Sequence, residues 1–232
     1  MKTYLVSLIL LCSLTSLTFG QRLNNNYISG AANTYSGEGL NVFDLRDRNS
    51  TKGSSYWSDE WHDGQVYLKD SSSVKGYALK YDLMGDVVEI QVSTNVKVLP
   101  TSRIIEFYID VNGTTHKFIN PTEYYEITTP TIGFFEAIYE GKSIILKKFE
   151  LDILQPDYVP ALDAGSLSKK IVQQKRYYWI YDGQLNIMPK SKSKMLKLME
   201  LLHPGVMEYA KEEKLNPKKE ADFIELSKFC DK

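Results

Sequence analysis

The three histidines are the side chains whose chemistry most readily supports catalysis or metal binding. They are His62, His116 and His203, far apart and without the spacing of metal ligands. His62 lies in the segment DEWHD, where Asp59, Glu60 and Asp63 are further candidate ligands for a cation. A metal site needs three or four converging ligands. We therefore interpret this segment as a solvated acidic loop before a strand, and the sequence predicts no metal site and no cofactor.

Signatures of a catalytic nucleophile are missing from the sequence. The chain has no G-x-S-x-G elbow, no H-E-x-x-H and no S-x-x-K with its partner motifs. Carboxylates are plentiful, and a pair such as Asp59 and Glu60 could act as acid and base on a glycoside. A hydrolase with an unrecognised site therefore stays open as an alternative. The sequence itself predicts no catalytic residue and a protein that is not an enzyme.

Aromatic side chains make up 12% of the chain, with sixteen tyrosines. Sheets favour aromatic residues, so most of these rings are expected to be structural. Tyr56, Trp57 and Trp61 differ because they lie on a polar segment before the first alternating strand. Tyrosine and tryptophan offer a large planar surface together with a hydrogen-bonding group. We predict these three residues as the ligand-binding candidates.

The first twenty residues have the parts of a secretory signal peptide. Lys2 supplies the positive charge, an apolar run follows from Tyr4 to Cys12, and Thr18 and Gly20 precede a cleavage point. The apolar run is shorter than the roughly 20 residues that span a bilayer. Lipid attachment at Cys12 is less favoured because a leucine precedes it where a small residue is needed. We expect export to the periplasm, the outer membrane or the cell exterior, without an integral span after cleavage.

Charge and cysteine content exclude further classes. Cleavage would remove one of 28 basic residues and none of the 29 acidic ones, which leaves a net charge of about −2. Acidic and basic residues are mixed along the chain, so no basic patch predicts nucleic-acid binding. Cys230 would be the one remaining cysteine, which rules out an intramolecular disulfide. We expect its thiol to serve as a small apolar side chain.

Alternation of apolar and polar residues with a period of two begins at residue 65 and is typical of strands. Four turn signals separate such runs: Gly85–Asp86, Asn112–Gly113, Glu140–Gly141 and Asp182–Gly183. Glycine is favoured where a tight hairpin requires a positive φ. The runs leave no room for the helical crossovers of a parallel nucleotide-binding sheet. The pattern therefore predicts an antiparallel meander.

The period becomes helical after Pro189, with Met195, Leu198, Met199, Leu201 and Leu202 on one broad face. Asn216 and Pro217 predict the start of a last helix. The predicted fold is α+β, mainly β: an antiparallel meander, as a twisted sheet or partly open barrel, followed by a small C-terminal helical segment. Its segments are a signal peptide (1–20), a loop-rich lead-in (21–55), the meander (56–154), a connecting loop (155–168), a β-hairpin (169–189) and C-terminal helices (190–232).

Four stretches of the chain resemble a group of exported envelope proteins of the Bacteroidota type, a family of unknown function. They are KGSSYWSDEWHDGQVYLKD (52–70), GYALKYDLMGDVVEI (76–90), GFFEAIYEGKSIILKK (133–148) and YAKEEKLNPKKEADFIELSKF (209–229). The resemblance covers most of the chain after the leader. It implies an envelope location in a Gram-negative cell, and it implies no activity and no site residues.

Three classes of function are compatible with these observations. The leading one is a non-catalytic envelope protein that binds a partner protein or a glycan, or has a structural role. The second is a carrier of a lipid or other apolar ligand in a half-open barrel, and the third is the hydrolase. A carrier requires an apolar cavity of several hundred Å³, whereas a simple module has an interior filled with side chains.

Overall fold

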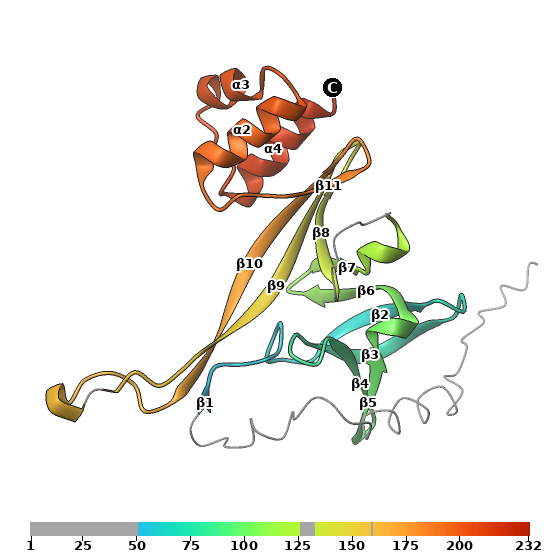
Figure 1. The fold of residues 1–232 in the computed structure, drawn as a ribbon. Coiled ribbons are helices and arrows are strands. Elements are labelled where there is room, and N and C mark those ends of the chain that lie inside the picture. The colour runs from blue at the N-terminus through green and yellow to red at the C-terminus, as the bar shows by residue number, and fades with distance from the viewer. Residues whose placement is uncertain (1–50, 126–132, 159) are drawn as a thin grey trace, which may run out of the picture.

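The computed structural model describes residues 51–125, 133–158 and 160–232 (Figure 1). The predicted signal peptide and residues 21–50 of the predicted lead-in lie outside this part of the chain. The strands are β1 (Thr51–Lys52), β2 (His62–Leu68), β3 (Ser73–Asp82), β4 (Val87–Val92), β5 (Asn95–Pro100), β6 (Ile104–Val111), β7 (Thr114–Ile119), β8 (Phe135–Glu140), β9 (Ile144–Leu154), β10 (Lys169–Tyr181) and β11 (Gln184–Ile187). The short 3₁₀ turns are η3 (Thr101–Arg103), η4 (Pro121–Glu123) and η5 (Pro160–Leu162).

These strands form one open sheet in the order β1-β10-β9-β8-β7-β6-β2-β3-β4-β5, with β11 also paired to β10. The described pairs are antiparallel except β1 with β10. The predicted mainly β, α+β fold is confirmed. The sheet consists of two meanders, β2 to β5 and β6 to β10, which are joined because β6 returns to pair with β2. Of the two forms predicted for the meander, the structure has the open sheet.

Two of the predicted hairpin turns show why their residues were informative. Asn112 and Gly113 link β6 to β7 with φ values of 50° and 79°, and Asp182 and Gly183 link β10 to β11 with 49° and 73°. Two consecutive positive φ angles are what a type I′ turn requires, and asparagine, aspartate and glycine tolerate them best. The turns therefore fix the register of these hairpins.

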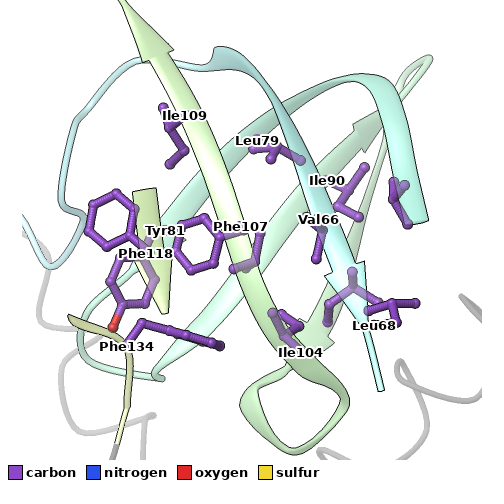
Figure 2. Close-up of a cluster of buried hydrophobic side chains, with 13 residues drawn as sticks. Val66, Leu68, Leu79, Tyr81, Ile90, Ile104, Phe107, Ile109, Phe118 and Phe134 are labelled. Atoms are coloured by element: carbon purple, nitrogen blue, oxygen red, sulfur yellow. The ribbon is translucent and has the colours of Figure 1, made fainter. Parts of the chain in front are cut away.

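The first meander, together with β6 and β7 of the second, encloses a core of aromatic and aliphatic side chains (Figure 2). Phe107 of β6 lies at its centre, with ring centroids 4.8 Å from Phe118, 4.9 Å from Phe134 and 5.3 Å from Tyr81. All four rings are buried. Edge-to-face and offset-stacked rings at such distances contribute beyond the area that they bury. The inner face of this half of the sheet is thus filled with side chains.

Residues 53–61, which we name the strap, connect β1 to β2 across this inner face. At one end the backbone passes so close to β10 that a Cβ on Gly53 would lie 2.4 Å from the Ile171 carbonyl oxygen. At the other end Trp57 donates its backbone N–H to the Tyr81 carbonyl at 2.9 Å. Gln173 of β10 donates its side-chain amide to the Tyr56 carbonyl at 2.6 Å. The strap therefore ties β10 to β3.

Three helices form the C-terminal end: α2 (Lys192–Leu202), α3 (Val206–Glu212) and α4 (Glu220–Cys230). The Ser191 hydroxyl caps α2 by accepting from the Lys194 N–H. The helices bury their apolar faces against Ile145 and Trp179 of the sheet. In the described parts of the chain, no helix combines the length and apolar character needed to cross a bilayer.

The last helix begins at Glu220, three residues later than the Asn216–Pro217 pair predicts. Asn216 makes a local cap instead, because its side-chain oxygen accepts from the Lys218 N–H and its carbonyl accepts from the Lys219 N–H. This hydrogen bonding closes a turn before the helix. Asp222 in the first turn of α4 then accepts from the Asn216 N–H at 2.8 Å.

Strands β9 and β10 form the longest pair, with register partners from Ile144↔Ile180 to Leu154↔Lys170. The predicted meander (56–154) and the predicted hairpin (169–189) are thus parts of the same sheet. The predicted connection 155–168 lies at one end of this pair and the helices lie beside its other end (Figure 1). The connection 155–168 contains the 3₁₀ turn η5.

Cys230 lies in the core between the helices and the sheet and is 6% exposed. Burial, followed by the nearby Asp231 carboxylate, raises the pKa of its thiol to about 12. Thiol reagents attack the thiolate, so we expect Cys230 to react with iodoacetamide at neutral pH only after unfolding. Peptide mass spectrometry of native and guanidinium-treated protein measures this. Rapid labelling of the native protein would contradict the buried position.

Candidate binding groove

An open groove of about 520 Å³ lies over β2, β3, β6 and the start of β7. Three tyrosines dominate its wall, together with two aspartates, a lysine, a glutamine and a threonine. The lining residues are Asp63, Gly64, Gln65, Tyr67, Lys75, Gly76, Tyr77, Tyr108, Asp110 and Thr115. The groove thus has a mixed polar and aromatic surface, unlike the largely apolar lining typical of small-molecule cavities.

The alternation of the strands places Gln65, Tyr67 and Tyr108 on the face opposite the core. Val66 and Phe107, their neighbours in sequence, are both fully buried in the core that β2 to β7 enclose. Gln65 is the register partner of Tyr108 on β6 and of Lys75 on β3. Three neighbouring strands therefore contribute one residue each to a row across the groove.

A β-bulge between Gly64 and Gln65 shifts the register of β2 against β3. A Cβ at Gly64 would lie 2.2 Å from the Tyr108 carbonyl oxygen and 2.7 Å from Leu79 Cδ1. Only glycine allows this close approach of the backbones. Bulges bend and twist a strand, which re-aims the side chains that follow it. The bulge lies at the position where the groove is formed.

The tyrosines of the groove are held by neighbouring side chains. The rings of Tyr67 and Tyr108 meet edge to face with centroids 5.8 Å apart. The Tyr108 hydroxyl donates to Glu106 Oε1 at 2.8 Å, and Tyr124 donates to the other oxygen at 2.6 Å. Burial and the Glu106 carboxylate raise the pKa of Tyr108, so its hydroxyl stays protonated. The rings are positioned before a ligand arrives.

Hydrogen-bond acceptors and hydrogen-bond donors both surround these rings. The carboxylates of Asp63 and Asp110 are acceptors, and the exposed Lys75 ammonium is a donor. Gln65 also lines the groove, and its side-chain nitrogen is buried without an acceptor among the described residues. An unsatisfied buried donor is unusual in a folded protein.

Tyr56, Trp57 and Trp61, the predicted binding residues, lie on the strap and do not line this groove. Trp57 packs inward, with its ring centroid 5.0 Å from His116 and 5.2 Å from Phe118. Tyr56 and Trp61 both contact Lys80, whose ammonium lies 4.2 Å and 5.8 Å from the centroids of their rings. Their role in binding stays a prediction, and the structure gives Trp57 a place in the core.

The rings of His62 and His116 both contact the Trp57 ring, with centroids 6.4 Å and 5.0 Å from it, whereas His203 lies apart from them among the helices. His62 Nε2 lies 2.7 Å from the Ser58 hydroxyl, His116 contacts Glu136, and His203 ends α2, with Nδ1 3.0 Å from the Tyr181 hydroxyl. Within the described ranges, no three histidine, cysteine or carboxylate side chains converge as a metal site. Asp63 of the predicted acidic loop instead belongs to β2 and lines the groove.

A buried charge network links the sheet to the helices. Glu136 and Lys147, register partners on β8 and β9, are 5% and 6% exposed. Lys147 Nζ lies 2.7 Å from Glu136 Oε2, as an ion pair without the alignment of a hydrogen bond, and 3.2 Å from both carboxylate oxygens of Glu220. His116 Nδ1 is 2.6 Å from the second Glu136 oxygen, and Tyr177 donates to Glu220 at 2.6 Å.

Glu220 is the residue through which α4 takes part in this network. Burial raises its pKa, but the hydrogen bond from Tyr177 and the Lys147 ammonium outweigh burial, so the pKa is lowered. Glu220 is therefore ionised at neutral pH and pairs with Lys147. The network has a structural role, since it holds the first turn of α4 against β9 and β10.

Comparison with known proteins adds no relative: no family model, no curated protein and no solved structure matches this chain.

Proposed function

We propose that this protein is an exported, non-catalytic envelope protein that binds a glycan in the tyrosine-lined groove. The observation that carries the proposal is the combination of one exposed and two half-buried tyrosines, Tyr67, Tyr77 and Tyr108, with carboxylate, ammonium and amide groups in one open groove. Sugar rings present apolar C–H faces that pack on aromatic rings, and their hydroxyls both donate and accept hydrogen bonds. An open groove suits a chain of sugars, which extends beyond the binding site at both ends.

The core favours this proposal over a carrier of apolar molecules. A carrier requires an apolar cavity, whereas side chains fill the inner face of the first meander (Figure 2). The groove lies on the opposite face and is lined by charged and polar groups. Such groups lose their hydration against a lipid chain without gaining a partner.

The test is affinity electrophoresis of the protein through gels that contain single neutral polysaccharides, followed by calorimetry with the polysaccharide that retards it. We expect Tyr67→Ala and Tyr108→Ala each to weaken binding by about 2 kcal/mol, the loss typical of an aromatic hot spot. That loss corresponds to a Kd roughly 30-fold higher. Circular dichroism shows whether each variant keeps the fold.

The matched controls are Tyr56→Ala and Trp61→Ala on the strap, which are expected to leave binding unchanged. A loss confined to these two variants would move the site to the Lys80 side and contradict the groove. Retardation by none of the polysaccharides would exclude this ligand class. Release of reducing ends from a bound polysaccharide would instead identify a hydrolase.

A further inference from the structure

The second half of the β9–β10 pair projects from the sheet as an arm, and β1 pairs with β10 there at Thr51↔Lys169 and Lys52↔Lys170 (Figure 1). The pairing of β9 with β8 ends at Lys147, so residues 148–154 pair with β10 alone among the described strands. We define the arm tip as residues 152–158 and 161–168. The arm tip lies far from the core that contains Phe107 and from the core between the helices and the sheet (Figure 1).

The arm tip exposes apolar side chains in an acidic setting. Leu162 is 74% exposed and Leu167 is 72% exposed, and Ile153 and Leu154 are 41% and 51% exposed. Single exposed leucines are ordinary, but a group of apolar residues at one end of a molecule is typical of an interaction site. The arm tip contains three aspartates and no lysine or arginine, and Lys169 and Lys170 follow it on β10, while Glu150 lies before it on β9. Glu150 pairs with Arg176.

The outer face of α2 and β11 has the opposite character. Residues 184–199 contain four lysines and no acid. Met195, Leu196 and Met199 are buried, which places Lys194, Lys197 and Leu201 on the outward side of α2. Leu201, which the helical pattern placed on the apolar face, is instead 79% exposed, and Ile187 at the end of β11 is 47% exposed. We name this surface the α2 face.

Glu200 does not neutralise the α2 face, because its carboxylate is already engaged. Its two oxygens accept from the backbone N–H groups of Gly205 and Met207 at 3.1 Å and 2.7 Å. These hydrogen bonds lower the pKa of Glu200 and fix the carboxylate at the start of α3. The lysines of the α2 face make no ion pair within the described chain.

We propose that the arm tip of one copy of this chain docks on the α2 face of a second copy. Leucines on the tip meet exposed apolar residues on the α2 face, and the aspartates at positions 152, 157 and 163 face its lysines. Asp157 and Asp163 each accept one hydrogen bond within the tip, at Oδ1, so the Oδ2 atom of each is the oxygen offered to a lysine. The two surfaces lie at opposite ends of the molecule (Figure 1). The arm tip of one copy therefore cannot reach the α2 face of the same copy.

The type of oligomer follows from the fact that the two contacting surfaces are different. A contact between unlike surfaces is head to tail, so each added copy leaves one free tip and one free α2 face. The product is an open chain or a closed ring of copies. Opposite charges attract less at high ionic strength, so the association is expected to weaken as salt is added.

Sedimentation velocity over a series of protein concentrations tests the proposal, and no glycan is needed. The tip variant is Leu162→Ser with Leu167→Ser, and the face variant is Lys194→Glu with Lys197→Glu. All four side chains are exposed, so both variants are expected to keep the fold. We expect species larger than a dimer for the wild type at low salt and monomers for each variant alone.

An equal mixture of the two variants gives the decisive result. The intact tip of the face variant docks on the intact α2 face of the tip variant, and both remaining surfaces are defective. The mixture is therefore expected to form a dimer that does not grow. Matched controls are Val96→Ser on β5 and Lys211→Glu on α3, two exposed positions elsewhere, which are expected to assemble like the wild type.

Three results would overturn the proposal: a wild type that stays monomeric at every concentration, variants that assemble like the wild type, or a mixture that stays monomeric. None of them bears on the groove, because all four substituted residues lie outside its lining. Failure of the glycan test would likewise leave this proposal standing. The two proposals are thus tested separately.

Discussion

Replacement of Lys147 by methionine is expected to lower the free energy of unfolding by about 3–5 kcal/mol, the cost of leaving a buried charge without its partner. Methionine fills a similar volume but leaves the Glu136 carboxylate, which is 5% exposed, without its ammonium. It also removes the partner of Glu220 on α4. Urea unfolding at neutral pH, followed by circular dichroism, measures the loss.

Two controls separate the loss of charge pairing from other effects of the substitution. Lys142→Met removes an exposed lysine and is expected to change stability by no more than about 0.5 kcal/mol. A double variant, Glu136→Gln with Lys147→Met, removes both charges and is expected to recover much of the loss. Equal losses for Lys147→Met and Lys142→Met would show that the network does not stabilise the fold.

Replacement of Trp179 by alanine is expected to cost about 3–5 kcal/mol, as for other large buried aromatic residues. Trp179 is fully buried and lies between the sheet and the helices, with Met195, Met199 and Phe223 in the same cluster. Its ring stacks on Tyr181 at 4.7 Å. Hydrogen exchange, read by mass spectrometry, is expected to speed up in α2 and α4, because the cavity weakens their contact with β10.

Trp179→Phe is the matched variant for this position. The indole N–H is buried without an acceptor among the described residues, so its removal breaks no hydrogen bond there. Phenylalanine keeps one ring in the core, and we expect a clearly smaller loss than for alanine. Unchanged exchange of α2 and α4 in Trp179→Ala would contradict the role of this side chain in holding the helices.

Local pattern predicted the elements of this fold but not their long-range pairing. Alternation and turn residues were sufficient for hairpins such as β6–β7, because Asn112 and Gly113 specify the turn themselves. The return of β6 to β2 depends on contacts between residues some forty positions apart, such as Val66 with Phe107. No local signal encodes that contact, so the sequence predicted one meander where the sheet has two.

The candidate site shows the same limit. Trp57 lies among polar residues in the sequence, which predicts exposure, yet the strap places it against Phe118 in the core. Tyr67 and Tyr108 alternate with buried residues, and this signal could have identified them as outward-facing rings. Their meeting at 5.8 Å follows from the β2–β6 register and was not predictable from either strand alone.

The strap also sets an order on the way this chain acquires its structure. Thr51 pairs with Lys169, more than a hundred residues further along the chain, and Gln173 holds the strap at Tyr56. Contacts so distant in sequence form slowly, because a long loop must close before they give any stabilisation. During synthesis the β1 end therefore waits until most of the chain has been made. Attachment of β1 and the strap to β10 is therefore expected to be a late step of folding.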